Sequence, residues 1–144
     1  MFIGEYNHNL DEKGRLAIPS KFRTDLKGGV VVTKGLDDCL FLYTKEAFLE
    51  EAKKAKSLPT ISNPQARAWV HNFLGGAMDL DLDAQGRVVL PEYLRNFANL
   101  KKKSVIVGMF DKLEIWDEER WNTYKNDAEK TNNQLAESLV GLGI

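Results

Sequence analysis

The chain has 144 residues, of which 43% are hydrophobic and 28% charged, and its formal net charge is −1. This composition is typical of a globular protein and excludes a disordered chain. No stretch approaches the roughly 18 consecutive apolar residues that a membrane-spanning helix needs, and the N-terminus lacks the basic segment and apolar core of a secretory signal. We therefore expect a cytoplasmic protein with no membrane partner.

The first predicted feature is a tight turn at residues 11–15, whose sequence is DEKGR. It is flanked by short predicted strands at residues 4–10 and 15–18, which gives it the chemistry of a β-hairpin. Gly14 can adopt the positive φ that such a turn demands, and Asp11 can accept hydrogen bonds from the turn amides. The turn then presents Lys13 and Arg15 to solvent.

Helices and strands follow in the rest of the first half. The predicted elements are a short helix at 20–26, strands at 30–34 and 39–43, and a helix at 45–56. Pro19 suits the first position of the short helix, and Thr44 can cap the longer one. Asn63 and Pro64 open a further helix that Gly75 and Gly76 end, so the segment joining the two halves is structured.

The second half repeats the first. Five matched pairs are separated by 72 residues: Asp11 and Asp83, Gly14 and Gly86, Arg15 and Arg87, Ile18 and Leu90, and Pro19 and Pro91. Later pairs, such as Gly35 and Gly108, are separated by 73, which one inserted residue explains. The repeat predicts strands at 77–82, 87–90, 104–108 and 113–116, and a closing helix capped by Asp117.

Each unit of about 45 residues is too small to bury a sound core alone, so we expect the strands of the two copies to interleave in a pseudo-twofold body. The predicted fold class is α+β, a β-barrel with flanking helices. Its predicted parts are a first repeat at 5–47, a helical linker at 48–76, a second repeat at 77–120 and a helical tail at 121–144.

The tail differs in character from the rest of the chain. Residues 1–110 hold 16 basic and 13 acidic side chains, whereas residues 111–144 hold 4 and 8. A polyanion would therefore meet the first part of the chain. Leu135, Leu139 and Leu142 form an apolar stripe at helical spacing, which favours packing between subunits.

Motifs typical of enzymes and metal sites are missing from the sequence. It contains no phosphate-binding loop, no dinucleotide-binding glycine pattern and no zinc-protease motif. His8 and His71 are isolated, and Cys39 lies in an apolar run where a buried thiol is the ordinary outcome. We expect no catalysis, no metal, no cofactor and no small-molecule substrate.

The duplicated Asp-x-x-Gly-Arg turn has two interpretations. Its Asp and Arg can simply pair and fix the turn, or its arginine can bind nucleic acid. Arginine can hold a phosphate and read guanine, and a two-stranded ribbon is narrow enough to enter the major groove. The basic residues around Arg15 favour the second interpretation, whereas Asp79, Asp81 and Asp83 make Arg87 the lesser contact. The candidate DNA-binding residues are Lys13, Gly14, Arg15, Lys21, Arg23 and Arg87, with Asp11, Asp83 and Gly86 as structural members of the motifs.

The sequence resembles the bacterial MraZ family. The residues that carry the resemblance are Met1-Phe2-Ile3-Gly4-Glu5-Tyr6, Leu10-Asp11-Glu12-Lys13-Gly14-Arg15, Ile18-Pro19, Phe22-Arg23 and Leu113-Glu114-Ile115-Trp116-Asp117. The resemblance implies two AbrB-like swapped-hairpin repeats in one barrel. It also implies a transcriptional regulator of the division and cell-wall gene cluster that binds double-stranded DNA at short repeats. A ring-like homo-oligomer, nucleoid association and a DNA-contacting role for Arg15, with Arg87 as its counterpart, are further implications.

Two other classes of protein remain open at the level of sequence. One is an antitoxin-like interaction module, in which the acidic tail binds a second protein. The other is a structural oligomer, in which the turns only pack.

Overall fold

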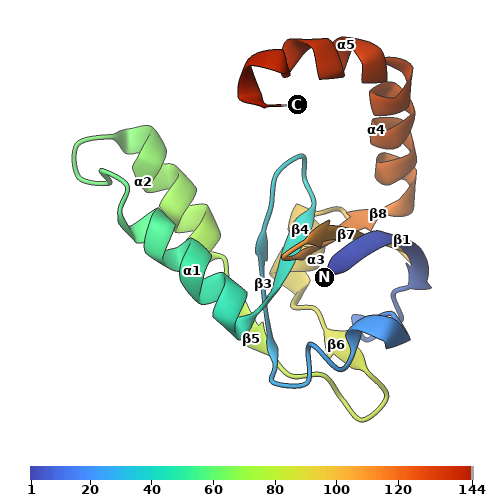
Figure 1. Ribbon diagram of the computed structural model, residues 1–144. Helices are drawn as coiled ribbons and strands as arrows, with labels where there is room; N and C mark the ends of the chain where they lie inside the picture. Colours follow the sequence, from blue (N-terminus) through green and yellow to red (C-terminus); the bar gives the residue numbers. More distant parts are fainter. Residues whose placement is uncertain (144) are drawn as a thin grey trace.

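Six strands form an antiparallel sheet whose order mirrors the internal repeat. The computed structural model describes residues 1–143. Its sheet has the order β1 (Phe2–Asn9), β7 (Lys103–Phe110), β8 (Leu113–Asp117), β4 (Leu40–Thr44), β3 (Val30–Lys34) and β5 (Met78–Leu80). The outer strands β1 and β5 each pair with a strand of the other half, β7 and β3. The two repeats therefore share one sheet (Figure 1).

A pseudo-twofold axis passes through the centre of this sheet. Phe41 of β4 lies opposite Glu114 of β8, and the flanking pairs join Leu40 to Ile115 and Leu42 to Leu113. The same symmetry governs a separate ribbon of two short strands, β2 (Arg15–Ala17) and β6 (Arg87–Val89), in which Leu16 lies opposite Val88.

The prediction that residues 4–10 and 15–18 pair with each other as a hairpin is wrong. The turn forms, but β1 and β2 are joined only by a bridge between Leu10 and Leu16. Along its length β1 pairs with β7, and β2 pairs with β6. The reason is the size of each repeat, which can bury its apolar side chains only against the other copy.

The main core lies between the sheet and the β2–β6 ribbon and takes side chains from both repeats. Its members are almost fully buried and include Leu16, Ile18, Phe22, Leu26, Val88, Leu90, Leu94, Ile106 and Ile115. Within residues 1–143 no strand pairing joins the edge strands β1 and β5. The fold is thus a mixed α+β structure with an antiparallel sheet that is not closed by hydrogen bonds.

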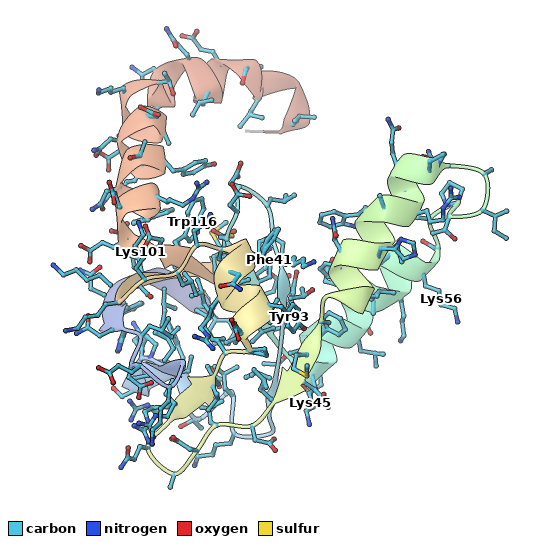
Figure 2. All side chains as sticks on the ribbon, turned by 180° about the vertical axis from the view of Figure 1, so that it is seen from behind. Phe41, Lys45, Lys56, Tyr93, Lys101 and Trp116 are labelled. Atoms are coloured by element: carbon cyan, nitrogen blue, oxygen red, sulfur yellow. The ribbon has the colours of Figure 1, made fainter. Side chains whose placement is uncertain are left out.

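Helices flank the sheet on two sides. In the first half they are a 3-10 turn η1 (Ser20–Phe22), α1 (Lys45–Lys56), α2 (Pro64–Val70) and a π-helical turn η2 (His71–Gly75). As expected, Thr44 Oγ1 accepts a hydrogen bond from the Ala47 amide at 3.1 Å, and Asn63 Oδ1 caps α2. The helix expected at 20–26 is only the short η1 turn. Lys45 and Lys56 mark the two ends of α1 in Figure 2, where α1 and α2 lead away from the sheet.

The second half ends in a helical arm. Its helices are α3 (Glu92–Phe97), α4 (Glu118–Lys130), α5 (Asn132–Ser138) and the 3-10 turn η3 (Val140–Leu142). Asp117 caps α4 as expected, and Trp116 packs against Trp121 with ring centroids 5.3 Å apart. The leucine stripe of the tail is exposed, with Leu142 77% accessible. Ile144, the last residue of the predicted tail, lies outside the described residues. None of the helices within residues 1–143 is long and apolar enough to cross a membrane.

Candidate nucleic-acid interface

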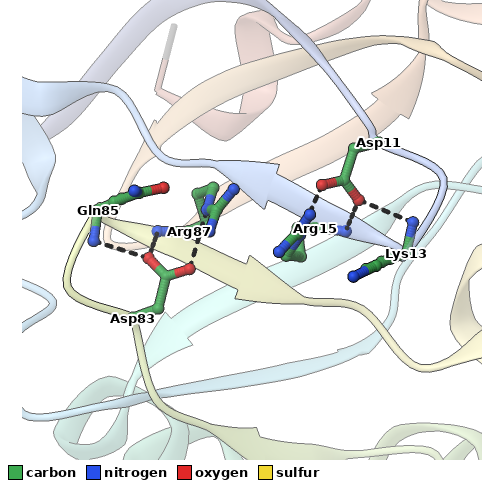
Figure 3. A network of polar contacts seen from close by, with 6 residues as sticks. All are labelled: Asp11, Lys13, Arg15, Asp83, Gln85 and Arg87. Atoms are coloured by element: carbon green, nitrogen blue, oxygen red, sulfur yellow. Dashed lines mark hydrogen bonds and ion pairs between the residues drawn. The ribbon is translucent and has the colours of Figure 1, made fainter.

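The two repeated turns have nearly the same geometry (Figure 3). In the first, Asp11 Oδ1 accepts hydrogen bonds from the amides of Lys13 and Arg15, both at 2.9 Å. Asp11 Oδ2 accepts a third from Arg15 Nε at 2.6 Å. In the second, the side chain of Asp83 accepts the equivalent three bonds, each at 2.9 Å, from Gln85 and Arg87. Each aspartate therefore fixes both the turn backbone and the arginine side chain.

Glycine is required at the same place in both turns. Gly14 has φ +79° and Gly86 has φ +75°, a backbone conformation that side chains with a Cβ rarely adopt. The backbone of each turn is also bound to the other repeat. The Ile18 amide donates to the Gly86 carbonyl at 2.9 Å, and the Leu90 amide donates to the Gly14 carbonyl at 2.8 Å. Each repeat therefore holds the turn of its counterpart.

The ribbon has one buried face and one exposed face. Leu16 and Val88 point into the core and are fully buried. Because side chains alternate along a strand, Arg15 and Arg87 lie on the opposite, outward face. Their side chains are 31% and 29% accessible. The pairing with aspartate thus leaves both guanidiniums accessible to a partner on the outer face.

The ion pairs orient the arginines more than they stabilise the fold. The hydrogen bonds from the Arg15 amide and side chain lower the pKa of the Asp11 carboxyl below its usual range, and those from Arg87 do the same for the pKa of Asp83. Both carboxylates are therefore charged well below neutral pH. Exposed pairs of this kind contribute little to stability because solvent screens them. Their main consequence is that Nε is fixed, so the rest of each guanidinium has a defined direction.

The basic residues that the sequence places near Arg15, namely Lys13, Lys21 and Arg23, do not all lie beside it in the structure. Lys13 lies exposed on the first turn, beside Arg15. Lys21 Nζ lies over the rings of Tyr6 and Phe22, at 5.4 and 5.5 Å from their centroids. The side chain of Arg23, in contrast, lies against Gly86 of the second turn. Arg23 therefore accompanies Arg87 and is separated from Arg15.

Lysines from another element join the first turn. A surface depression there is lined by Leu10, Asp11, Glu12, Lys13, Arg15, Lys101 and Lys102. The Leu10 amide donates to the Lys102 carbonyl at 2.7 Å, which fixes the lysine loop beside the turn. Figure 2 shows Lys101 near the base of α4. The second turn has Gln85 where the first has Lys13, and Asp79 and Asp81 precede it in the sequence. The first turn therefore has the more basic surroundings.

One arginine that sequence analysis missed lies at this interface. Arg95 of α3 packs against Gly14, where a Cβ would lie 3.0 Å from Arg95 Nε. The signal that identifies it is the internal repeat, because Arg23 and Arg95 are separated by the same 72 residues as Arg15 and Arg87.

Within residues 1–143, groups typical of metal or thiol chemistry are not brought together. Across the part of the chain that is described, no three His, Cys, Asp or Glu side chains cluster as metal ligands would. Cys39 is fully buried, and burial raises the pKa of its thiol far above the usual range. A low-pKa, accessible thiol is what reactive cysteines need, so Cys39 is a core residue.

Comparison with known proteins reveals close relatives. The family described as "MraZ protein, putative antitoxin-like" matches residues 1–71 and, a second time, residues 73–142. The chain belongs to the MraZ family. The two starting points are 72 residues apart, which is the separation of the repeated Asp-x-x-Gly-Arg turns.

Two relatives are similar over their whole length. A protein of Desulforamulus reducens named "Transcriptional regulator MraZ" is 46% identical over 142 residues, covering 99% of each chain. One of Syntrophomonas wolfei subsp. wolfei with the same name is 46% identical over 144 residues, covering 100% of each. These MraZ relatives therefore align with the sheet, the ribbon and the helices of both halves.

Proposed function

We propose that this chain is a sequence-specific, DNA-binding transcriptional regulator of the MraZ type. The observation that carries the proposal is the pair of guanidiniums held by Nε on the outer face of the β2–β6 ribbon. The names of the two full-length relatives support it. Neither the proposal nor its test requires a metal, a cofactor or a catalytic residue.

The β2–β6 ribbon is the part of the molecule that inserts into the major groove of the DNA. A two-stranded ribbon fits the major groove, where the two Nη groups of Arg15 can donate to O6 and N7 of one guanine. Lys13 and Lys21 contact phosphates on the flanks, and Gly14, which the Arg95 side chain covers, permits the turn conformation that presents Lys13 and Arg15. Arg87 and Arg23 make the equivalent contacts at the second turn. The first turn is the stronger contact because Lys101 and Lys102 add positive charge to it.

Oligomerisation supplies affinity that one ribbon lacks. The protein forms a ring-like homo-oligomer whose ribbons bind repeated DNA boxes upstream of the division and cell-wall gene cluster, within the nucleoid. Linked sites of this kind can gain on the order of 10² to 10⁴ in apparent affinity. Exposed apolar side chains support self-association: Ile61 is 94%, Leu142 77% and Phe110 69% accessible. Phe110 also has φ +68°, a strained conformation for an aromatic residue.

We extend the proposal to the architecture of the two repeats. Residues 5–47 and 77–120 are two AbrB-like swapped-hairpin repeats that curl into one barrel. Residues 48–76 join them, and residues 121–144 form a tail that contacts neighbouring subunits.

A titration of the full chain against duplex DNA tests the proposal. Wild-type protein should shift a fragment from its own upstream region at lower concentration than an unrelated fragment of equal length. The binding constant should fall steeply with salt, because phosphate contacts release counterions. Light scattering on the same sample should give a mass of several protomers. An oligomer with no affinity for either fragment at low salt would contradict the proposal and favour a structural role.

A further inference from the structure

Arg95 is fixed at the first turn although it comes from the second repeat. Its Nε donates to the Leu90 carbonyl at 3.0 Å, and its side chain is half-buried. A Cβ on Gly14 would lie 3.0 Å from Arg95 Nε and 3.1 Å from Cζ. The guanidinium therefore lies directly against the turn that carries Arg15.

The same arrangement occurs at the second turn with the repeats exchanged. Arg23 Nε donates to the Ile18 carbonyl at 2.9 Å. The Arg23 side chain packs so closely on Gly86 that a Cβ there would overlap it, with Cζ at 2.8 Å. Each end of the ribbon thus carries two arginines, one from each repeat.

These four arginines share a bonding pattern that the other two arginines of the chain do not have. Arg15, Arg23, Arg87 and Arg95 each bond through Nε, and no hydrogen bond between residues 1 and 143 uses their Nη atoms. Arg67 and Arg120 instead bond through Nη. Arg67 donates to the carbonyls of Thr60 and Ile61, and Arg120 donates to the Asp37 carbonyl and the Asp38 carboxylate. At the ribbon, then, the part of the guanidinium that best binds an anion is left free.

The charges at the first turn favour Arg95 as a further anion ligand. The Asp11 carboxylate already balances Arg15, and Glu12 adds a further negative charge to the turn. Lys13, Lys101 and Lys102 lie at the same turn, and Arg95 adds a guanidinium to the positive charge that a DNA phosphate would meet there. Arg95 has no carboxylate partner, because its only side-chain bond in the described chain is to a neutral carbonyl.

We propose that Arg95 binds a DNA phosphate beside Arg15, so that a pair of guanidiniums from different repeats grips the duplex at each end of the ribbon. Arg23 and Arg87 form the second pair. A phosphate is the ligand because Arg95 is held behind the turn by its Nε bond, with two Nη donors matched to phosphate oxygens. This inference rests on the proposed DNA-binding function and adds a contact residue to it.

Salt dependence distinguishes this role from a purely structural one. We would titrate full-length protein with its upstream duplex by fluorescence anisotropy at several salt concentrations. Arg95→Met retains the length of the side chain, and Arg67→Met is a matched control for loss of one arginine. Arg95→Met should weaken binding to specific and unrelated duplexes alike by roughly tenfold. It should also make the slope of log binding constant against log salt concentration shallower by about 0.9 for each protomer that contacts the DNA. Arg95→Lys should retain the slope, because lysine also binds phosphate.

The possible outcomes separate this inference from the proposed function. Wild-type protein that fails to bind any duplex contradicts the function itself. If wild type binds and Arg95→Met has the wild-type affinity and slope, only the role of Arg95 is wrong. A loss confined to the specific duplex, with an unchanged slope, would also overturn the phosphate assignment.

A labelling experiment covers the case in which Arg95→Met does not fold. Phenylglyoxal modifies accessible guanidiniums, and mass spectrometry reports the extent at each arginine of wild-type protein. Bound DNA should protect Arg95 and leave Arg67 unchanged. Equal modification of Arg95 with and without DNA would overturn the inference.

Discussion

The close contact between Gly86 and Arg23 predicts a large effect for one added methyl group. Gly86→Ala places a Cβ at φ +75°, where a left-handed conformation costs an L-residue about 1–2 kcal/mol. The Cβ also displaces the Arg23 side chain and breaks its bond to Ile18, which costs about 1–2 kcal/mol more. The free energy of unfolding should therefore fall by about 2–4 kcal/mol, which corresponds to a Tm decrease of roughly 7–13 °C for a chain of this size.

Two other glycines provide controls for the Gly86→Ala prediction. Gly14→Ala should be milder, at about 1–2 kcal/mol, because Arg95 Nε at 3.0 Å and the Leu90 carbonyl oxygen at 3.1 Å need to shift by much less than Arg23 does at Gly86. Gly28→Ala should change the free energy of unfolding by less than about 0.5 kcal/mol, since nothing lies within 4 Å of its Cβ. Urea unfolding and thermal melts followed by circular dichroism measure all three. A Gly86→Ala protein as stable as Gly28→Ala would refute the packing of Arg23 on the second turn.

Two further predictions concern stability and folding. Because the folded-state pKa values of Asp11 and Asp83 are depressed, their contribution to stability is present above about pH 4 and is lost as the pH falls through the depressed values. Urea unfolding at several pH values should show a larger loss in wild type than in the Asp11→Asn, Asp83→Asn double variant, in which Glu5, whose pKa the hydrogen bond from Lys125 also lowers, still titrates. Identical pH profiles would contradict the prediction. A fragment of residues 1–76 should be unfolded by circular dichroism, because β1 and β2 lose their partners β7 and β6. A native-like spectrum of that fragment would show that one repeat folds alone.

Local chemistry made much of the fold predictable from sequence. The helix caps at Thr44, Asn63 and Asp117 and the positive φ of Gly14 are where the sequence predicted them, because each depends on only a few neighbouring residues. The separation of 72 residues likewise predicted that the two halves would interleave.

Strand partners could not be predicted in the same way. The turn at residues 11–15 has hairpin chemistry, yet β1 and β2 take their partners from the second repeat. Pairing depends on where the apolar faces of both copies can be buried, which local sequence does not specify. The closed barrel expected from the resemblance depends on the same non-local packing.

The sequence predicted the turn motif of the candidate site but not all of the arginines that lie there. The sequence shows that Asp11 and Arg15 share a turn, and the structure adds that Asp11 holds Arg15 by Nε. It cannot show that Arg23 lies at the opposite turn, or that Arg95 comes to the first, because both depend on the crossing of the two repeats. Applying the repeat separation to every arginine would have identified Arg95 as a candidate.

The central claim is that the Arg15 guanidinium reads DNA from the outer face of the ribbon. Its most direct test is the affinity of Arg15→Ala for the upstream duplex, measured beside Arg120→Ala, which also removes an arginine paired with an aspartate at the surface. Both variants should keep the wild-type fold and mass. The account predicts that Arg15→Ala loses about 1–3 kcal/mol of specific binding, roughly 5- to 150-fold, while Arg120→Ala binds as wild type. A folded Arg15→Ala protein with wild-type affinity would contradict it.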